Sequence, residues 1–106
     1  MSTGIKDGNI SLNSVFYVTL SPAEVAANTA AEETFTVSGL KVNDHVSVNK
    51  PTSQAGLGVV GARVSAADTL AINFGNFTSN AITPTAAENY TVLVSRPESL
   101  SSGIKS

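Results

Sequence analysis

Apolar and polar side chains alternate along several short segments of the chain. Over residues 69–74, Leu70, Ile72 and Phe74 alternate with smaller or polar residues, and residues 90–95 repeat this pattern. A period of two is typical of a β-strand that buries one of its faces. These two segments are therefore the clearest predicted strands.

Four further segments show the same alternation, with Gly, Asn, Asp and Pro between them as turn signals. We expect six strands, over residues 14–20, 34–38, 46–49, 59–65, 69–74 and 90–95. Short strands at this spacing predict an all-β domain, either an antiparallel β-sandwich or a small barrel of jelly-roll type. The predicted core is Phe16, Val18, Leu20, Phe35, Val37, Val46, Val48, Val64, Leu70, Ile72, Phe74, Tyr90, Val92 and Val94.

Residues 21–33 carry conflicting signals. Ser21, Pro22 and Glu24 resemble a helix start, with a capping serine, a proline in the first turn and a glutamate three residues after the cap. Asn28 interrupts the pattern after about two turns. We expect at most a short turn of helix, or an irregular extended connector.

The length of 106 residues corresponds to one domain. We assign residues 14–97 to the sandwich, residues 1–13 to an extended N-terminal arm and residues 98–106 to a polar C-terminal tail. The arm has three spaced apolar residues, Ile5, Ile10 and Leu12, which are candidates for docking on a partner.

Composition narrows the class of partner. Charged residues make up only 13% of the chain, about half the usual ~25%. The six basic residues are scattered and form no patch, so we expect no nucleic-acid binding. No apolar run approaches the ~20 residues of a membrane helix. The first residues lack the basic start and apolar core of a signal peptide, so we expect synthesis in the cytoplasm.

The sequence shows no arrangement of residues typical of an enzyme. Its single histidine, His45, lies in a turn beside Asp44 and has no cysteine or second histidine as a companion ligand. The glycine-containing segment 56–61 leads into a strand, unlike a phosphate-binding loop. The acidic candidates for paired-carboxylate chemistry are Glu32, Glu33, Asp44, Asp68 and Glu88, and turn chemistry or solubility explains each better. We expect a non-enzyme without metal or cofactor.

Four apolar residues fall on the outward faces of the expected strands: Val15, Tyr17, Val59 and Leu93. If they cluster in space, they form a patch of the kind that marks a protein contact. An alternative is a carbohydrate-binding or adhesin-type module, in which sugars stack on Tyr17 or Phe77.

Two segments also resemble a known family. They are FTVSGLKVNDHVSVNKP at residues 35–51 and GLGVVGARVSAADTLAINFGNFTSNAITPTAAENYTVLVSR at residues 56–96. Together they resemble small β-rich proteins encoded in the structural-gene regions of tailed bacteriophages. The shared pattern is carried by Val37, Gly39, Leu40, Asp44, Val46 and Val48, by residues 61–65, by Asp68, Thr69, Leu70, Ile72 and Phe74, and by Ile82, Pro84, Tyr90 and Val92.

This resemblance implies a virion protein, either a capsid decoration (cement) protein or a module of a head or tail fibre. A decoration protein would bind the major capsid protein or other virion proteins on the capsid surface, and it would usually be an oligomer, with a trimer favoured. The resemblance implies no catalytic residue.

Overall fold

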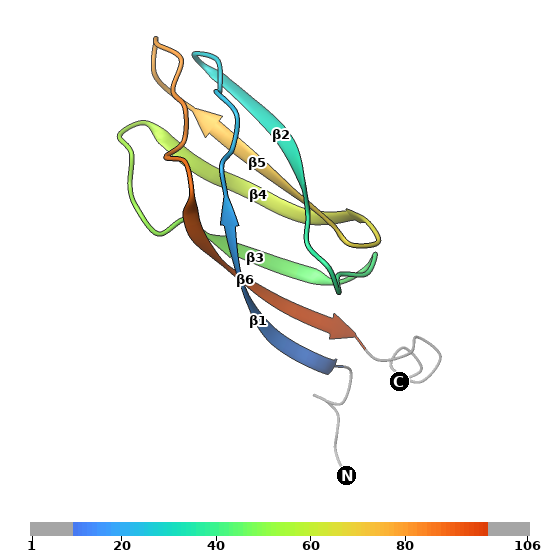
Figure 1. The fold of residues 1–106 in the computed structure, drawn as a ribbon. Coiled ribbons are helices and arrows are strands. Elements are labelled where there is room, and N and C mark those ends of the chain that lie inside the picture. Colours follow the sequence, from blue (N-terminus) through green and yellow to red (C-terminus); the bar gives the residue numbers. More distant parts are fainter. Residues whose placement is uncertain (1–9, 98–106) are drawn as a thin grey trace.

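The computed structural model of the chain describes residues 10–97, which form six β-strands and no helix. The strands are β1 (Ile10–Leu20), β2 (Thr29–Thr36), β3 (His45–Asn49), β4 (Leu57–Ala66), β5 (Thr69–Asn76) and β6 (Glu88–Pro97). They build two three-stranded antiparallel sheets, in the orders β1-β6-β3 and β2-β5-β4 (Figure 1). The prediction of an all-β sandwich is confirmed.

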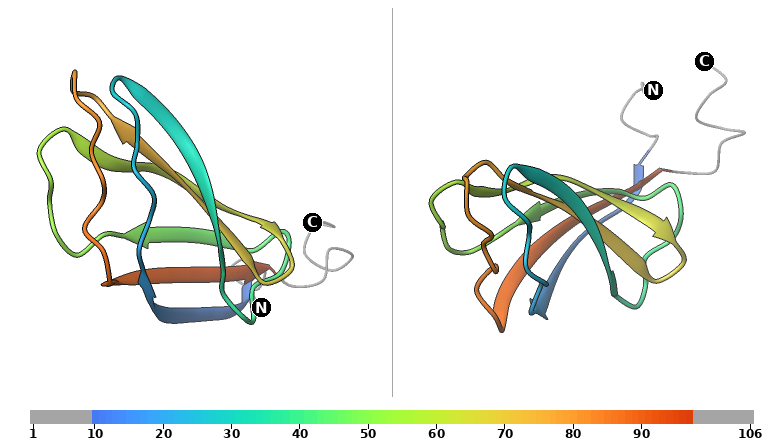
Figure 2. Two further views of the ribbon diagram at one scale, coloured as in Figure 1. Left: turned by 45° about the horizontal axis from the view of Figure 1, so that its top comes forward. Right: turned by 90° about the horizontal axis from the view of Figure 1, so that it is seen from above.

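The two sheets pack face to face, and connecting segments close the space between them. Residues 21–28 and 77–87 run side by side between the sheets (Figure 2). Val25 and Ile82 join these segments by two backbone hydrogen bonds, of 2.8 and 3.0 Å. Two connectors without regular structure thereby cover one side of the core.

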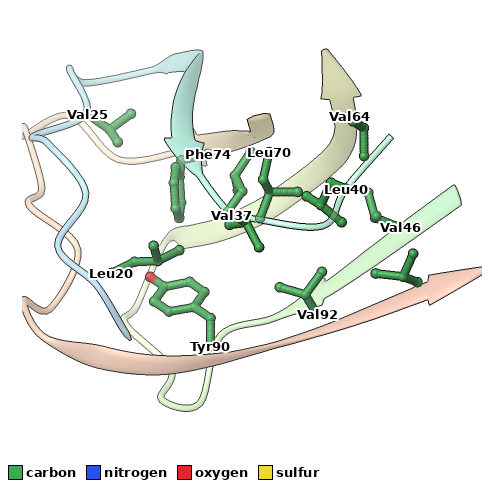
Figure 3. Close-up of a cluster of buried hydrophobic side chains, with 12 residues drawn as sticks. Leu20, Val25, Val37, Leu40, Val46, Val64, Leu70, Phe74, Tyr90 and Val92 are labelled. Atoms are coloured by element: carbon green, nitrogen blue, oxygen red, sulfur yellow. The ribbon is translucent and has the colours of Figure 1, made fainter. Parts of the chain in front are cut away.

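The core lies between the central strands of the two sheets. Leu70 and Phe74 of β5 face Tyr90 and Val92 of β6 (Figure 3). Ile72 of β5 belongs to the same cluster, and all five side chains are at most 1% exposed. Central strands bury their inward side chains most completely, because each has a neighbouring strand on both sides. The members of the predicted core that the structure buries are Leu20, Val37, Val46, Val64, Leu70, Ile72, Phe74, Tyr90, Val92 and Val94.

The other predicted core residues, Phe16, Val18, Phe35 and Val48, pack against the core but are only partly buried. All four lie on the outermost strands of their sheets, where one flank has no neighbour. Val25 and Leu40, at 3% and 1% exposed, belong to the core although the sequence analysis did not include them. They lie on connectors, where no alternating pattern reveals which side chains point inward.

Strand β1 begins at Ile10, four residues earlier than expected. Residues 10–13, assigned from the sequence to the N-terminal arm, belong to the sheet and pair with the end of β6. The assignment of residues 10–13 to the arm was therefore wrong, because they pair with β6. The rest of the arm, with Ile5, and the expected tail at residues 98–106 lie outside the described residues.

Residues 21–33 contain no helix. The hydroxyl of Ser21 accepts a hydrogen bond from the backbone N–H of Ala87 at 2.9 Å, and does not cap a helix. Glu33 accepts a hydrogen bond from the N–H of Ala23 at 2.8 Å. Residues 21–28 are the irregular connector that was the other expectation, and β2 begins at Thr29. Long-range contacts, the Val25–Ile82 bridge in the connector and the pairing of β2 with β5, thus outweigh the local helix signals.

A buried asparagine fastens both connectors to the end of β5. The amide nitrogen of Asn76 donates to the carbonyl oxygens of Val25 and Asn80 at 3.0 and 2.8 Å. Its amide oxygen accepts from the backbone N–H and the hydroxyl of Thr78 at 2.9 and 2.7 Å. Because every polar atom of this side chain has a partner, Asn76 is tolerated at 0% exposure.

We expect the connector residue Leu40 to contribute as much stability as a strand residue. Leu40→Ala should lower the free energy of unfolding by about 2–5 kcal/mol, since it opens a cavity in the core. The matched control is Val42→Ala, at a side chain 54% exposed, for which the change should stay within about 0.5 kcal/mol. Urea unfolding measures both values, and equal effects of the two substitutions would contradict the assignment of Leu40 to the core.

Tyr90 introduces a pH dependence into the core. Its hydroxyl is buried and has no hydrogen-bond partner among the described residues. Burial, together with the nearby negative charges of Glu88 and Glu33, raises the pKa of Tyr90 to about 12. The folded state therefore holds this proton more tightly than the unfolded state, in which the pKa is about 10. The resulting stability is complete below pH 10 and is lost as the pH rises through the folded pKa of about 12.

We predict that Tyr90→Phe makes the loss of stability between pH 10 and about 12 shallower than in the parent protein. At neutral pH this variant should be at least as stable as the parent, since a hydroxyl without a partner is removed. Tyr17→Phe, at a side chain 68% exposed, is the control. Denaturant unfolding over a pH series tests the prediction, and an equally steep loss in Tyr90→Phe would refute it.

Candidate interaction surface

The outward face of the β1-β6-β3 sheet carries an apolar cluster. The strand register places Val15 of β1 directly opposite Leu93 of β6. Tyr17 lies opposite Thr91 on the same face, and is therefore diagonal to Leu93. We call Val15, Tyr17 and Leu93 the outer cluster.

The outer cluster is well exposed and has a polar, uncharged border. Val15 and Leu93 are each 50% exposed and Tyr17 is 68% exposed. Small polar side chains from the same three strands surround them: Asn13, Thr19, Ser47, Asn49, Asn89, Thr91 and Ser95. His45, exposed at the start of β3, is the only Asp, Glu, Lys, Arg or His residue that the register of residues 13–95 places on this face.

The structure brings together three of the four outward residues predicted for an interface, and Val59 is the exception. Strand β4 has a register shift between Val59 and Gly61, where one extra residue, Val60, is inserted. Val59 lies opposite Phe74 and packs against the core, whereas Val60 is 49% exposed. The prediction that Val59 points outward was wrong, because a β-bulge at Val60 reverses the alternation of side chains.

Of the three apolar residues expected to dock through the arm, the structure places two in the sheet. Ile10 and Leu12 lie within β1, where their backbones pair with Pro97 and Arg96. Ile5 lies outside the described residues. The outer cluster is therefore the part of the predicted interface whose side chains the structure places together on one exposed face.

A second exposed apolar pair lies on the other sheet. Phe77 is 69% exposed, and its ring covers the outward side of Gly75 together with Val60. A Cβ atom at position 75 would come within 2.8 Å of the Phe77 ring and 3.0 Å of Val60. Residue 75 must therefore be glycine unless the Phe77 ring moves away from it. Phe77 was expected from the sequence only as a sugar platform. Gly58 and Gly61, on either side of the bulge, are the sequence signal for the exposure of Val60.

A cavity of about 210 Å³ opens between β3 and β4, the neighbouring outer strands of the two sheets. It is lined by Val46, Ser47, Val48, Val59, Val60, Gly61 and Ala62. The lining contains one hydroxyl and no charged side chain, whereas small-molecule sites place a few convergent polar groups in an apolar pocket. The cavity therefore offers little to orient a polar ligand.

Each of the five acidic residues considered for paired-carboxylate chemistry has a structural contact. Asp44 accepts two hydrogen bonds from the Arg96 guanidinium, at 2.8 and 2.9 Å, which lowers the pKa of this carboxyl. The Nη2 atom of Arg96, which donates one of these two bonds, also donates to the carbonyl oxygen of Gly39 at 2.8 Å and so ties the loop before β3 to β6. Asp68 accepts from the N–H of Gly39 at 2.7 Å, and so joins the β4–β5 turn to the same loop.

The remaining acids are held in the same way. Glu32 forms a two-pronged pair with Arg63 at 2.9 and 3.0 Å across the outward face of β5, and these hydrogen bonds lower the pKa of Glu32. Glu88 accepts a hydrogen bond from Thr52, which lowers its pKa, and forms an ion pair with Lys50 at 3.0 Å. Glu33 binds the N–H of Ala23, as described above. Through these contacts, the five acidic side chains hold loops and strands in place.

Within residues 10–97, no group of three or more His, Cys, Asp or Glu side chains is arranged to hold a metal ion. The same residues contain no helix long and apolar enough to cross a membrane. Searches against known protein families, curated proteins and solved structures found no match to this chain.

Proposed function

We propose that the protein is a non-enzymatic structural component of a tailed-bacteriophage particle, and specifically a capsid decoration protein that binds neighbouring capsid subunits. The observation that carries the proposal is the outer cluster of Val15, Tyr17 and Leu93 on an open, uncharged sheet face. Its partner would be the major capsid protein or another virion protein.

The chemistry of this face favours a protein as the partner. Protein interfaces are depleted of charge at their centre, enriched in aromatic side chains and bordered by polar groups. The outer cluster has Tyr17 beside two aliphatic side chains and a border of Ser, Thr and Asn. An open sheet face does not enclose a small molecule, whereas ligand sites bury most of the ligand surface.

The assignment to a phage particle rests on the resemblance of residues 35–51 and 56–96 to phage structural proteins. The rigidity that a decoration protein needs has a counterpart in the contacts of the sandwich. The Asp44–Arg96 and Lys50–Glu88 pairs bind loops to the ends of the sheets. The resemblance and these ion pairs support the proposal, because both are expected of a rigid capsid decoration protein.

A carbohydrate-binding module is less well supported. Tyr17 lies on the outward face of the β1-β6-β3 sheet, whereas Phe77 covers Gly75 on the outward face of the other sheet. The two rings therefore cannot stack on the same sugar, and each would act as a single platform. A glycan array with the purified protein, and with Tyr17→Ser as its control, distinguishes this alternative.

The proposal predicts that the protein sediments with phage particles. A tagged copy, expressed in cells that produce the bacteriophage encoding this protein, should appear in the particle band of a density gradient. An antibody against the tag should label the heads of the particles. Leu93→Glu should lower the amount bound by about tenfold or more, because it buries a charge at the centre of the contact. The matched control is Val60→Glu, at a side chain of similar exposure on the other sheet, which should bind like the parent.

Circular dichroism of both variants verifies that the β-fold is intact. Particles that lack the unmodified protein would refute the proposal. Label on tails would contradict a decoration role and indicate a fibre component.

A further inference from the structure

Three of the four outermost strands carry features that discourage pairing with another chain. Strand β2 has Glu33 on its inward side and Glu32 on its outward side. Strand β3 has only five residues and is followed by Lys50 and Pro51. Strand β4 has two register shifts and carries Arg63. Inward charges, short length, proline and bulges are the usual means by which proteins protect a free sheet edge.

Strand β1 is the exception. It is the longest strand, with 11 residues, and its sequence ISLNSVFYVTL contains no charged residue, proline or glycine. It pairs with β6 on one flank, and the part of the chain that the structure describes supplies no strand for its other flank (Figure 1). The pairing is regular from Leu12 to Leu20, since the one register shift lies between Ile10 and Leu12.

The inward side chains of β1 also remain incompletely covered. Phe16 and Val18 are partly buried, whereas Val92 and Tyr90, opposite them on β6, are fully buried. A strand added beside β1 would cover this flank and bond its free backbone groups. The flank therefore has the chemistry of a strand-addition site.

We propose that the free edge of β1 pairs with β1 of a second copy, antiparallel and around a two-fold axis. The β1-β6-β3 sheets of the two copies would then form one continuous six-stranded sheet. The absence of charge favours a second copy as the occupant, because β1 meets itself without opposing like charges at any register. The outer strands of the enlarged sheet would be the two β3 strands, which are short and followed by Lys50 and Pro51, so the assembly would end at two copies.

Symmetry restricts the register. Inward residues must pair with inward residues, so the two-fold axis passes through a residue position and not between two positions. We place the axis at Phe16, the register that sets Val15 opposite Tyr17 of the second copy in two equivalent pairs. Pairs of an aromatic and a β-branched residue are favourable across strands. The outer clusters of the two copies then form one continuous apolar surface.

The proposed dimer does not depend on the particle assignment, since purified protein alone tests it. Light scattering during size-exclusion chromatography, over a concentration series, should give twice the 10.8 kDa mass of the chain. A monomer at all concentrations would overturn the proposal. A trimer, which the resemblance to phage proteins implies, would also contradict two-fold pairing.

Charge exchange tests whether β1 forms the contact. A lysine variant (Val15→Lys with Tyr17→Lys) and a glutamate variant (Val15→Glu with Tyr17→Glu) should each be monomeric, because like charges then oppose each other. An equimolar mixture of the two should regain the dimer, since every lysine meets a glutamate. Both positions are at least half exposed, so the fold should persist. Val60→Lys, with similar exposure on the other sheet, should remain dimeric.

The natural absence of cysteine makes disulfide trapping a clean test of the register. Oxidation of a mixture of Val15→Cys and Tyr17→Cys proteins should give mainly the mixed dimer. Predominant cross-linking of Val15→Cys protein with itself would overturn the register centred on Phe16. Failure of the mixed charge variants to associate would overturn the β1 contact itself.

Discussion

The packing of β5 against β6 is the contact on which the remaining structure depends. Each is the central strand of its sheet, and the alternating side chains of both strands meet in the space between the sheets. Leu70, Ile72, Tyr90 and Val92 are completely buried there. Because burial of apolar surface is the main favourable contribution to folding, the four outer strands are positioned by pairing with these two.

Polar contacts then fix the loops that the core leaves undetermined. Asn76 holds two connectors at one end of β5, and the Asp44–Arg96 pair holds the loop before β3 against β6. In both places a buried or half-buried polar side chain satisfies backbone groups that no strand pairs. Such contacts give the irregular segments of the domain one defined conformation.

The sequence was sufficient for the elements in which alternation is strong and insufficient where a local irregularity changes the pattern. All six strands and ten core residues followed from a period of two, whereas Leu40 and Val25 lie on connectors with no period. The helix signals at Ser21 failed because long-range contacts, the Val25–Ile82 bridge and the hydrogen bond from Ala87 to Ser21, hold this connector in an irregular conformation. At the candidate interface, the bulge at Val60 explains the single misplaced residue, Val59. The grouping of the other three outward residues required the strand order, which alternation does not contain.

The alternation that builds the core also leaves Val15, Tyr17 and Leu93 on an uncharged outer face. Strand β1, whose outer edge is unpaired, contains no charged residue. Both proposed contacts therefore require the β5–β6 core to remain intact while the edge of β1 and the outer sheet face bind other chains. Amide hydrogen exchange measures this order of stability directly. The slowest amides should lie in β5 and β6 and exchange only by global unfolding, with β2 and β3 exchanging faster. Maximal protection in β2 or β3, with faster exchange in β5 or β6, would contradict the account.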